Sequence, residues 1–361
     1  MPDGTQQSQA LATLLTEASA RLASQLAALP PGAVRLSDMG RHYLRCFLGA
    51  PEMMLDRYRR ILERALLLAR RPPAALRLAD YGGGLGVLSL LARRAGIGQV
   101  VYCDISADTC EDAQRLARAL DLEAGHYVKG DVTALADFGR ATGTGFDVLV
   151  SADVLEHIYD LEDFFSKLPL LGREGLAVVM ITSANHHNPW IRRQLMRGHR
   201  QTEYKDLPKK WEQGKRDTLH SYFSLRCRIV SQRAPQLPED QVRRLAKATR
   251  GLVKPAIEKC VDEYLRTGNV SRSPDHPTNT CCPYTGYWAE RLVKTAYYRQ
   301  LLAVNGFAAK ITAGRWTATG GPARRAVKGV LNFLIRRLAG RPLCLAPYLL
   351  IEATLEEGRK C

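Results

Sequence analysis

The stretch Asp80-Tyr81-Gly82-Gly83-Gly84-Leu85-Gly86 joins an apolar run at 75–78 to a second apolar run at 87–95. The first run predicts a strand and the second a helix. The alternating glycines allow a sharp turn between them and a close approach of the backbone to a ligand, because no Cβ intervenes. The next strand-like run, 99–103, ends on Asp104, whose carboxylate can accept two hydrogen bonds from ribose hydroxyls. The sequence therefore predicts a site for an adenosine-bearing cofactor.

Two later segments fit the same kind of site. Gly130-Asp131-Val132 follows a third strand-like run at 126–129. A fourth strand-like run, at 146–150, ends in Ser151-Ala152-Asp153-Val154-Leu155-Glu156-His157-Ile158. Ligands of open α/β sheets lie outside the carboxyl ends of the strands, so we expect these segments at one edge of the sheet.

The glycine spacing distinguishes between cofactors. A dinucleotide site needs G-x-G-x-x-G, and counting from Gly82 the last position falls on Val87, which disfavours a nicotinamide oxidoreductase. The spacing D-x-G-x-G-x-G resembles the first motif of class I S-adenosylmethionine (SAM) methyltransferases, and Asp104 matches their second. The segment from Asp153 to His157 resembles the D-V-L-E-H segment of the ubiquinone-biosynthesis type, the methyltransferase type 11 group.

The resemblance implies an α/β fold with a Rossmann-like seven-stranded class I methyltransferase sheet, and SAM as the cofactor. It is firm over about residues 75–182 and weaker at 295–313 and 345–355. It places the acid after the third strand near the adenine amino group. The cofactor-binding residues that it implies are Asp80, Gly82, Gly83, Gly84, Gly86, Asp104, Ile105, Asp131, Val132 and Ser151.

Patterning divides the chain into four regions. Residues 1–72 form an N-terminal helical extension, broken by Pro30-Pro31-Gly32, which is either a lid over the cofactor or a packing cap. Residues 73–182 alternate strand and helix and form the SAM-binding Rossmann-like core. Its clearer helices are expected at 108–120 and 161–168, and its fifth strand at 176–182.

The remaining two regions follow strand five. Residues 183–287 are a large, mostly helical insertion where the family usually has a short loop, and we expect the substrate module there. Residues 288–361 return to the core. Helices are predicted at 190–200, 219–232, 239–249, 254–267 and 288–304, strands at 307–312 and 346–354, and a basic amphipathic helix at 324–341.

Methyl transfer needs the acceptor to be positioned and, for a hydroxyl or amine, deprotonated. His157 follows the fourth strand and is the candidate base, or else a residue that orders the loop. Asp153 is the second catalytic candidate, in contact with the cofactor loop or the substrate. Asp153, Glu156 and His157 could also ligate a hard divalent ion, but one short cluster is weak support, and we predict no bound metal.

Two polar loops carry the candidate substrate-binding residues. Asn-Pro-Trp at 188–190 marks the start of a helix. Asn188 is either a residue of the acceptor site or the N-cap of this helix, and the two roles are compatible. The family's amine-specific N-P-P-[YFW] motif belongs at the end of strand four, where this chain has Ser-Ala-Asp-Val, which argues against exocyclic-amine chemistry. The residues predicted to bind the acceptor are His186, Asn188, Trp190 and Tyr284.

Composition is that of a soluble enzyme. The 361 residues are 46% hydrophobic and 24% charged, and no apolar run approaches the roughly 18 residues needed to span a bilayer. The N-terminus lacks a basic segment followed by an apolar core, so a secretory signal is not expected. Nine cysteines, an odd number with no C-x-x-C pair, suggest reduced thiols and a cytoplasmic location.

The charge is strongly positive. Fifty-two basic and 36 acidic residues give a net charge of +16. Residues 315–341 contain seven basic residues and no acid. The excess is either a solvated surface or a surface for an anionic membrane, an anionic substrate or nucleic acid, although no recognisable nucleic-acid module accompanies it.

In the segment 324–341 the basic residues are part of an amphipathic helical pattern. One helical face carries the apolar residues Val327, Val330, Leu331, Leu334 and Leu338, and cations lie on the other. This is the composition of a helix that lies on an anionic bilayer, which would make the protein peripheral at the inner membrane surface. The alternative is that the apolar face packs on the protein's own sheet.

The leading hypothesis is a SAM-dependent methyltransferase that acts on a small-molecule acceptor, lipid-linked or anionic. The alternatives are a non-catalytic SAM-fold binding module and a nucleic-acid methyltransferase, which only the charge suggests. The methylated atom, whether oxygen, nitrogen or carbon, and the oligomeric state stay open.

Overall fold

The computed structural model describes residues 4–30, 32–172, 175–206, 211–212, 215–216, 220–270, 273, 276, 278–338 and 342–356. They group into two compact units. The first contains the described residues up to Val154, those of Glu162–Ser183 and those from Thr295 onward. The second contains Leu155–Leu161 and Ala184–Lys294. The loop after the fourth strand therefore groups with the insertion, a division that the sequence analysis did not anticipate.

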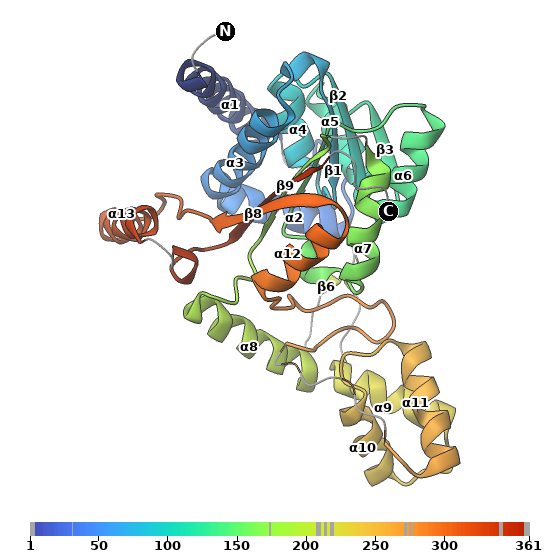
Figure 1. Ribbon diagram of the computed structural model, residues 1–361. Coiled ribbons are helices and arrows are strands. Elements are labelled where there is room, and N and C mark those ends of the chain that lie inside the picture. The colour runs from blue at the N-terminus through green and yellow to red at the C-terminus, as the bar shows by residue number, and fades with distance from the viewer. Residues whose placement is uncertain are drawn as a thin grey trace. The chain divides into compact units, whose positions relative to one another are not determined.

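The first unit is built on a seven-stranded sheet in the order β3-β2-β1-β4-β5-β9-β8 (Figure 1). Among these strands β9 runs antiparallel to both neighbours, and the other pairings are parallel. The predicted Rossmann-like sheet is confirmed. Its strands are β1 (Arg77–Tyr81), β2 (Gln99–Asp104), β3 (His126–Lys129), β4 (Val148–Ala152), β5 (Ala177–Thr182), β8 (Phe307–Ala313) and β9 (Leu349–Leu355).

Burial of apolar residues stabilises this sheet. Every residue of β5 is buried, as expected for a central strand covered on both faces. The connecting helices are α4 (Val87–Arg94), α5 (Ala107–Ala119), α6 (Val132–Ala141), α7 (Leu161–Lys167) and α12 (Thr295–Val304). Helix α6 was not among the helices expected from the sequence. It begins where the Asp131 carboxylate accepts hydrogen bonds from the N–H groups of Thr133 (2.9 Å) and Ala134 (3.2 Å).

The helix predicted over 288–304 begins later, because α12 starts at Thr295. The preceding backbone is engaged elsewhere: the N–H of Ala289 donates to the carbonyl of Thr280 at 2.9 Å. Glu290 has a φ of 59°, in the left-handed region. A helix could not continue through this conformation, so the first part of that prediction is wrong.

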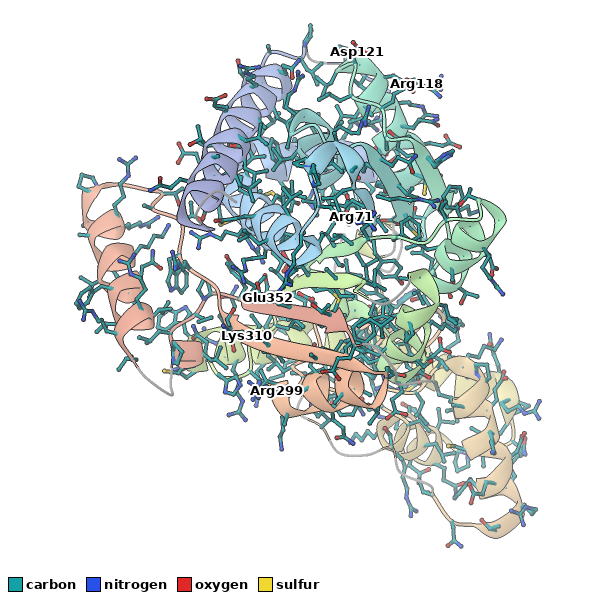
Figure 2. All side chains as sticks on the ribbon, turned by 45° about the horizontal axis from the view of Figure 1, so that its top comes forward. Arg71, Arg118, Asp121, Arg299, Lys310 and Glu352 are labelled. Atoms are coloured by element: carbon teal, nitrogen blue, oxygen red, sulfur yellow. The ribbon has the colours of Figure 1, made fainter. Side chains whose placement is uncertain are left out.

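The N-terminal extension consists of α1 (Gly4–Ala27), α2 (Asp38–Gly49) and α3 (Pro51–Ala69). Leu15, Ala18 and Leu22 of α1 join the core of the first unit, and α3 packs against β4 and β5. Arg64 of α3 forms an ion pair with Glu352, which Figure 2 shows on β9 beside Lys310 of β8. For α1 and α3 these contacts are those of a packing cap.

The start of α2 is fixed separately. Ser37 caps the helix by accepting a hydrogen bond from the N–H of Gly40 at 3.0 Å. The backbone N–H of Ser37 donates to Asp112 at 2.9 Å, and its hydroxyl donates to the same carboxylate. Asp112 is fully buried on α5. This carboxylate therefore joins α2 to the core helix that follows β2.

The second unit is mainly helical. It contains α8 (Pro189–Tyr204), the two-residue strands β6 (Trp211–Glu212) and β7 (Lys215–Arg216), α9 (Tyr222–Arg233), α10 (Glu239–Ala248) and α11 (Lys254–Thr267). An apolar core joins α9, α10 and α11. Arg226 of α9 is fully buried, paired with Glu203 of α8, and donates from Nε to the Ala246 carbonyl at 2.8 Å. The attraction between the two charges offsets part of the free-energy cost of burying them.

The basic amphipathic segment forms α13 (Pro322–Arg337), which belongs to the first unit and lies to one side of the sheet (Figure 1). Residues 339–341 of the predicted segment lie outside the described residues. Val327 and Val330 are each 59% exposed and Phe333 is 51% exposed. Of the predicted apolar face, Val327, Val330 and Leu338 are exposed, whereas Leu331 and Leu334 are partly buried, so the face is not packed as a whole against the protein. No helix in the described part of the chain has the length and apolarity needed to cross a membrane.

Candidate cofactor and active site

The glycine loop is fastened to β2 and tightly packed at its start. The N–H groups of Gly82 and Gly83 donate to the carbonyl of Cys103, at 2.8 and 3.2 Å. A Cβ on Gly82 would lie 2.5 Å from a methyl carbon of Val154, and φ is +67° there. A side chain at Gly82 is therefore excluded both by space and by conformation.

Gly84 differs from its neighbours. Its φ is +54°, but a Cβ placed on it would meet only the ring of Tyr43, at 3.8 Å. The loop therefore presents open space at Gly84, and a side chain there would occupy that space. The carbonyl of Gly84 accepts a hydrogen bond from the Tyr102 hydroxyl at 2.6 Å, which fixes the peptide orientation.

Asp104 lies directly beside this opening. One carboxylate oxygen accepts the N–H of Gly84 at 3.1 Å, and the other accepts the N–H of Ser106 at 2.9 Å. Burial raises the pKa of Asp104, although these backbone hydrogen bonds act in the opposite direction. Ile105, the next residue, is 58% exposed and offers apolar surface. An open glycine, a carboxylate acceptor and exposed apolar surface fit an adenosine-bearing cofactor.

The other acid of the loop, Asp80, is buried at the end of β1. Its carboxylate accepts the Ser89 hydroxyl at 2.7 Å, and burial raises its pKa to about 7. Gly86 closes the loop with a φ of +77°, and a Cβ there would approach Ala113 to 3.1 Å. These two residues shape the turn into α4.

The remaining predicted cofactor residues contact the protein itself. Asp131 caps α6, Val132 is buried, and the buried Ser151 hydroxyl donates to the Tyr81 carbonyl at 2.9 Å. These contacts stabilise the strand ends from which the loops leave. Direct contact of the three residues with the cofactor stays a prediction.

The carboxyl end of β4 carries an ion pair that the sequence did not reveal. Asp153, with a φ of 57°, accepts three hydrogen bonds on one carboxylate oxygen: from Arg57 Nη2 (2.8 Å), from the Ser183 N–H (2.9 Å) and from the Ser183 hydroxyl (2.8 Å). The Arg57 guanidinium also lies over the ring of Tyr348, at 4.8 Å. This network favours a positioning role for Asp153 over that of a base.

Two tyrosines from the N-terminal helices adjoin the same acids. Partial burial and the Asp104 carboxylate raise the pKa of Tyr43 to about 12. Burial, with Asp153 close by, raises the pKa of Tyr58 as well. Helices α2 and α3 therefore contribute side chains to the cofactor edge. The helical pattern of the sequence does not predict that these side chains reach the cofactor edge, because Tyr and Arg are common on amphipathic helix surfaces.

His157 belongs to the second unit, in the short helical turn Leu155–His157. Its Nδ1 lies 2.8 Å from the carbonyl oxygen of Trp288, and its ring stacks on Tyr287 with centroids 4.4 Å apart. A carbonyl oxygen can only accept, so Nδ1 carries the hydrogen. In the neutral ring the lone pair is then on Nε2, the tautomer that a general base needs.

The predicted acceptor-binding residues also lie in the second unit. The ring of His186 contacts that of His187 at 3.8 Å, and burial, with cations nearby, lowers its pKa to about 4. Asn188 caps α8 by accepting the N–H of Trp190 at 3.0 Å. Trp190 is 77% exposed and Tyr284 is 48% exposed. Their role in acceptor binding stays a prediction. Within the described residues, no group of three or more His, Cys, Asp or Glu side chains could hold a metal ion.

Comparison with known proteins agrees with this geometry. The family model described as a methyltransferase domain matches residues 79–175. A curated relative, the ubiquinone biosynthesis O-methyltransferase of Chelativorans sp. (strain BNC1), is 34% identical over 110 residues, which are 30% of this chain and 40% of that protein. The chain thus matches about two fifths of this relative's length.

Solved structures resemble the chain more distantly. An S-adenosylmethionine-dependent methyltransferase from Mesorhizobium loti is 18% identical, with 81% of this chain and 97% of that chain covered and a TM-score of 0.36. Magnesium protoporphyrin IX methyltransferase from Synechocystis PCC 6803, solved with bound SAH, is 15% identical, with 84% and 85% covered and a TM-score of 0.36.

The sheet order, the glycine loop and the acid at the end of β2 are those of a class I SAM-dependent methyltransferase fold. Residues 79–175 match the family model of a methyltransferase domain, and the open glycine loop with Asp104 fits S-adenosylmethionine as the cofactor.

Proposed function

We propose that the chain transfers a methyl group from SAM to a hydroxyl group of a small-molecule acceptor. The observation that carries the proposal is the pairing of Gly84 with Asp104, 3.1 Å apart at the N–H and the carboxylate, at a position open to a ligand. When bound there, SAM supplies the electrophilic methyl group. The protein must then hold the cofactor, orient the acceptor and remove its proton.

Asp104 accepts hydrogen bonds from the ribose hydroxyls, and the open Gly84 lets the loop backbone approach the cofactor. Exposed Ile105 offers apolar surface to the adenine. The Arg57–Asp153 pair holds the end of β4 in its left-handed turn. These residues bind and position, and none of them needs to exchange a proton during the reaction.

His157 is the proposed base. The hydrogen bond from Nδ1 to the Trp288 carbonyl selects the tautomer whose Nε2 can take a proton. The stacked Tyr287 ring restricts the imidazole plane. A positioned base of this kind contributes about 10²–10⁴-fold to proton transfer.

A hydroxyl acceptor is proposed on two grounds. The curated relative is an O-methyltransferase of ubiquinone biosynthesis. The end of β4 reads Ser151-Ala152-Asp153-Val154, which lacks the amine-specific motif. The small molecule is proposed to be lipid-linked or anionic, in line with the net charge of +16.

The proposal is tested by measuring S-adenosylhomocysteine formation with a panel of phenols, catechols and lipid-linked phenols, and with amines as the contrasting class. We expect turnover with a hydroxyl-bearing acceptor, and loss of turnover in Asp104→Ala. SAM binding without turnover on any acceptor class would indicate the non-catalytic binding module instead. Turnover with amines alone would contradict the hydroxyl assignment.

A further inference from the structure

We propose that α13 is a docking helix for an anionic lipid surface. The inference concerns a partner of the protein and does not rest on methyl transfer.

Polar side chains hold α13 in place. Asn332 accepts the N–H of Trp316 at 2.8 Å and donates from Nδ2 to the Trp316 carbonyl at 2.7 Å. Lys328 donates to the hydroxyl and carbonyl of Thr319, at 2.8 and 2.9 Å. Ile335, on the same side, is the helix residue that is buried. The helix is therefore anchored through a face centred on Asn332.

The segment that leads into the helix is itself fixed to the rest of the first unit. The indole N–H of Trp316 donates to the Leu345 carbonyl at 2.8 Å. The Thr317 hydroxyl donates to Asp56 of α3 at 2.9 Å. These contacts set the orientation of α13 before any partner binds, so the helix presents a fixed face.

The face it presents is apolar. Ala323, Ala326, Val327, Val330 and Phe333 follow the helical spacing and are all exposed; we call them the exposed stripe. Exposed apolar residues in isolation are ordinary, but a continuous stripe on one helix marks an interaction surface. A 16-residue helix extends about 24 Å, enough to lie along a surface.

The cations of α13 indicate which kind of partner the exposed stripe fits. Arg324, Arg325, Arg336 and Arg337 are exposed on α13, and the helix contains no acid. The Arg337 guanidinium lies 5.5 Å from the Phe333 ring centroid, at the edge of the exposed stripe. An apolar stripe bordered by cations complements a bilayer of anionic lipids, where apolar side chains enter the acyl boundary and cations meet headgroups. A second copy of the same helix would bring like charges together.

The test is cosedimentation of the purified full chain with vesicles of phosphatidylglycerol and phosphatidylcholine, compared with phosphatidylcholine alone. We expect binding to the anionic vesicles at low salt and weaker binding at high salt, because the attraction between cations and headgroups is screened. Val330→Glu and Phe333→Glu should each reduce binding by about tenfold or more, because a charge must then enter the acyl boundary.

Matched controls lie on α12 of the same unit. Val304→Glu changes a valine that is 66% exposed, and Arg299→Gln removes an exposed cation (Figure 2). Both should bind vesicles like the unchanged protein, whereas Arg325→Gln and Arg336→Gln should each weaken binding about fivefold. Unfolding curves for every variant separate loss of binding from loss of fold.

Three results would overturn the proposal. The first is failure to bind anionic vesicles at low salt. The second is equal loss of binding in the α12 controls. The third is a concentration-dependent dimer in sedimentation velocity that Phe333→Glu abolishes while vesicle binding persists, since the exposed stripe would then be an interface between copies of this chain.

Discussion

Two acids at the ends of neighbouring strands, Asp80 and Asp104, have different surroundings. Asp80 is enclosed and bonds to Ser89 of α4, whereas Asp104 bonds to the backbone of the open glycine loop. The pattern D-x-G-x-G-x-G names both as cofactor residues, but the contacts suggest separate tasks. Asp80 shapes the turn, and Asp104 is the acceptor that a ribose can reach.

Substitution of Gly84 or Asp104 should affect cofactor affinity directly. Gly84→Val places a side chain in the open space and strains a backbone with φ of +54°, so SAM binding should be abolished. Asp104→Ala should weaken binding by about 1.5–3 kcal/mol, the usual range for hydrogen bonds to a charged group. Calorimetric titration measures the SAM affinity of both variants. Unchanged affinity in a folded Asp104→Ala variant would contradict the proposal that Asp104 binds the ribose hydroxyls.

Asp80 should make stability depend on pH. Its folded-state pKa of about 7 lies above the ordinary value of 3.8, so the folded protein retains a proton that the unfolded chain releases. The free energy of unfolding should therefore fall as pH rises from about 4 to about 7, by up to about 1.4 kcal/mol per pH unit. Urea unfolding should show a shallower fall in Asp80→Asn; an unchanged slope would exclude Asp80 as its source.

His157 should matter more for turnover than for cofactor affinity. His157→Ala should lower turnover by roughly 10²–10⁴ if the imidazole is the base, with SAM affinity nearly kept. Tyr287→Leu, which removes the stacked ring but leaves the base, should have a smaller effect. A loss of SAM affinity in His157→Ala, with full turnover at saturating SAM, would instead indicate a structural role.

At the scale of elements, α3 is both a packing cap and part of the cofactor edge. Its apolar face joins the core of the first unit, while Arg57 reaches the end of β4. Apolar spacing in the sequence predicts the first property. It cannot predict the second, because Arg57 and Asp153 are 96 residues apart and meet only through the packing of α3 on the sheet.

The Arg57–Asp153 pair should stabilise this packing measurably. Arg57→Ala leaves a partly buried carboxylate without its cation, so we expect the free energy of unfolding to fall by about 1–3 kcal/mol. Asp153→Asn keeps a residue that tolerates the left-handed conformation and isolates the loss of charge. Arg60→Ala, which removes an ion pair internal to α3, is the control and should cost under about 1 kcal/mol. Additive effects of Arg57→Ala and Asp153→Asn in the double variant would contradict the coupling.

The sequence predicted most of the sheet and less of its surroundings. Buried strands such as β5 are continuous apolar runs, Asp80 is part of the glycine-loop motif, and Asp104 is predicted from its place at the end of β2. The start of α12 was missed because backbone contacts from Ala289 to Thr280 override the local pattern. The apolar face predicted for α13 shares Val327 and Val330 with the exposed stripe, but Leu331 and Leu334 are partly buried and Phe333 is exposed instead, which follows from the anchoring through Asn332 and not from the helical spacing.

At the scale of the whole molecule, the residues assigned to cofactor binding and those assigned to acceptor binding belong to different units. The predicted cofactor-binding residues lie in the first unit, while His157 and the predicted acceptor-binding residues lie in the second. The net charge of +16 is concentrated in part on α13, which carries five basic residues and no acid. We therefore assign cofactor binding and surface docking to the first unit, and acceptor choice to the second.

The central claim, that the first unit is a SAM site, is tested most directly by calorimetric titration of S-adenosylhomocysteine into the purified full chain, with NAD titrated in parallel. We expect saturable binding of S-adenosylhomocysteine at one site per chain and no heat from NAD, because the glycine spacing and the open position at Gly84 suit S-adenosylhomocysteine. Binding of NAD without binding of S-adenosylhomocysteine, or binding of neither by the folded protein, would contradict it.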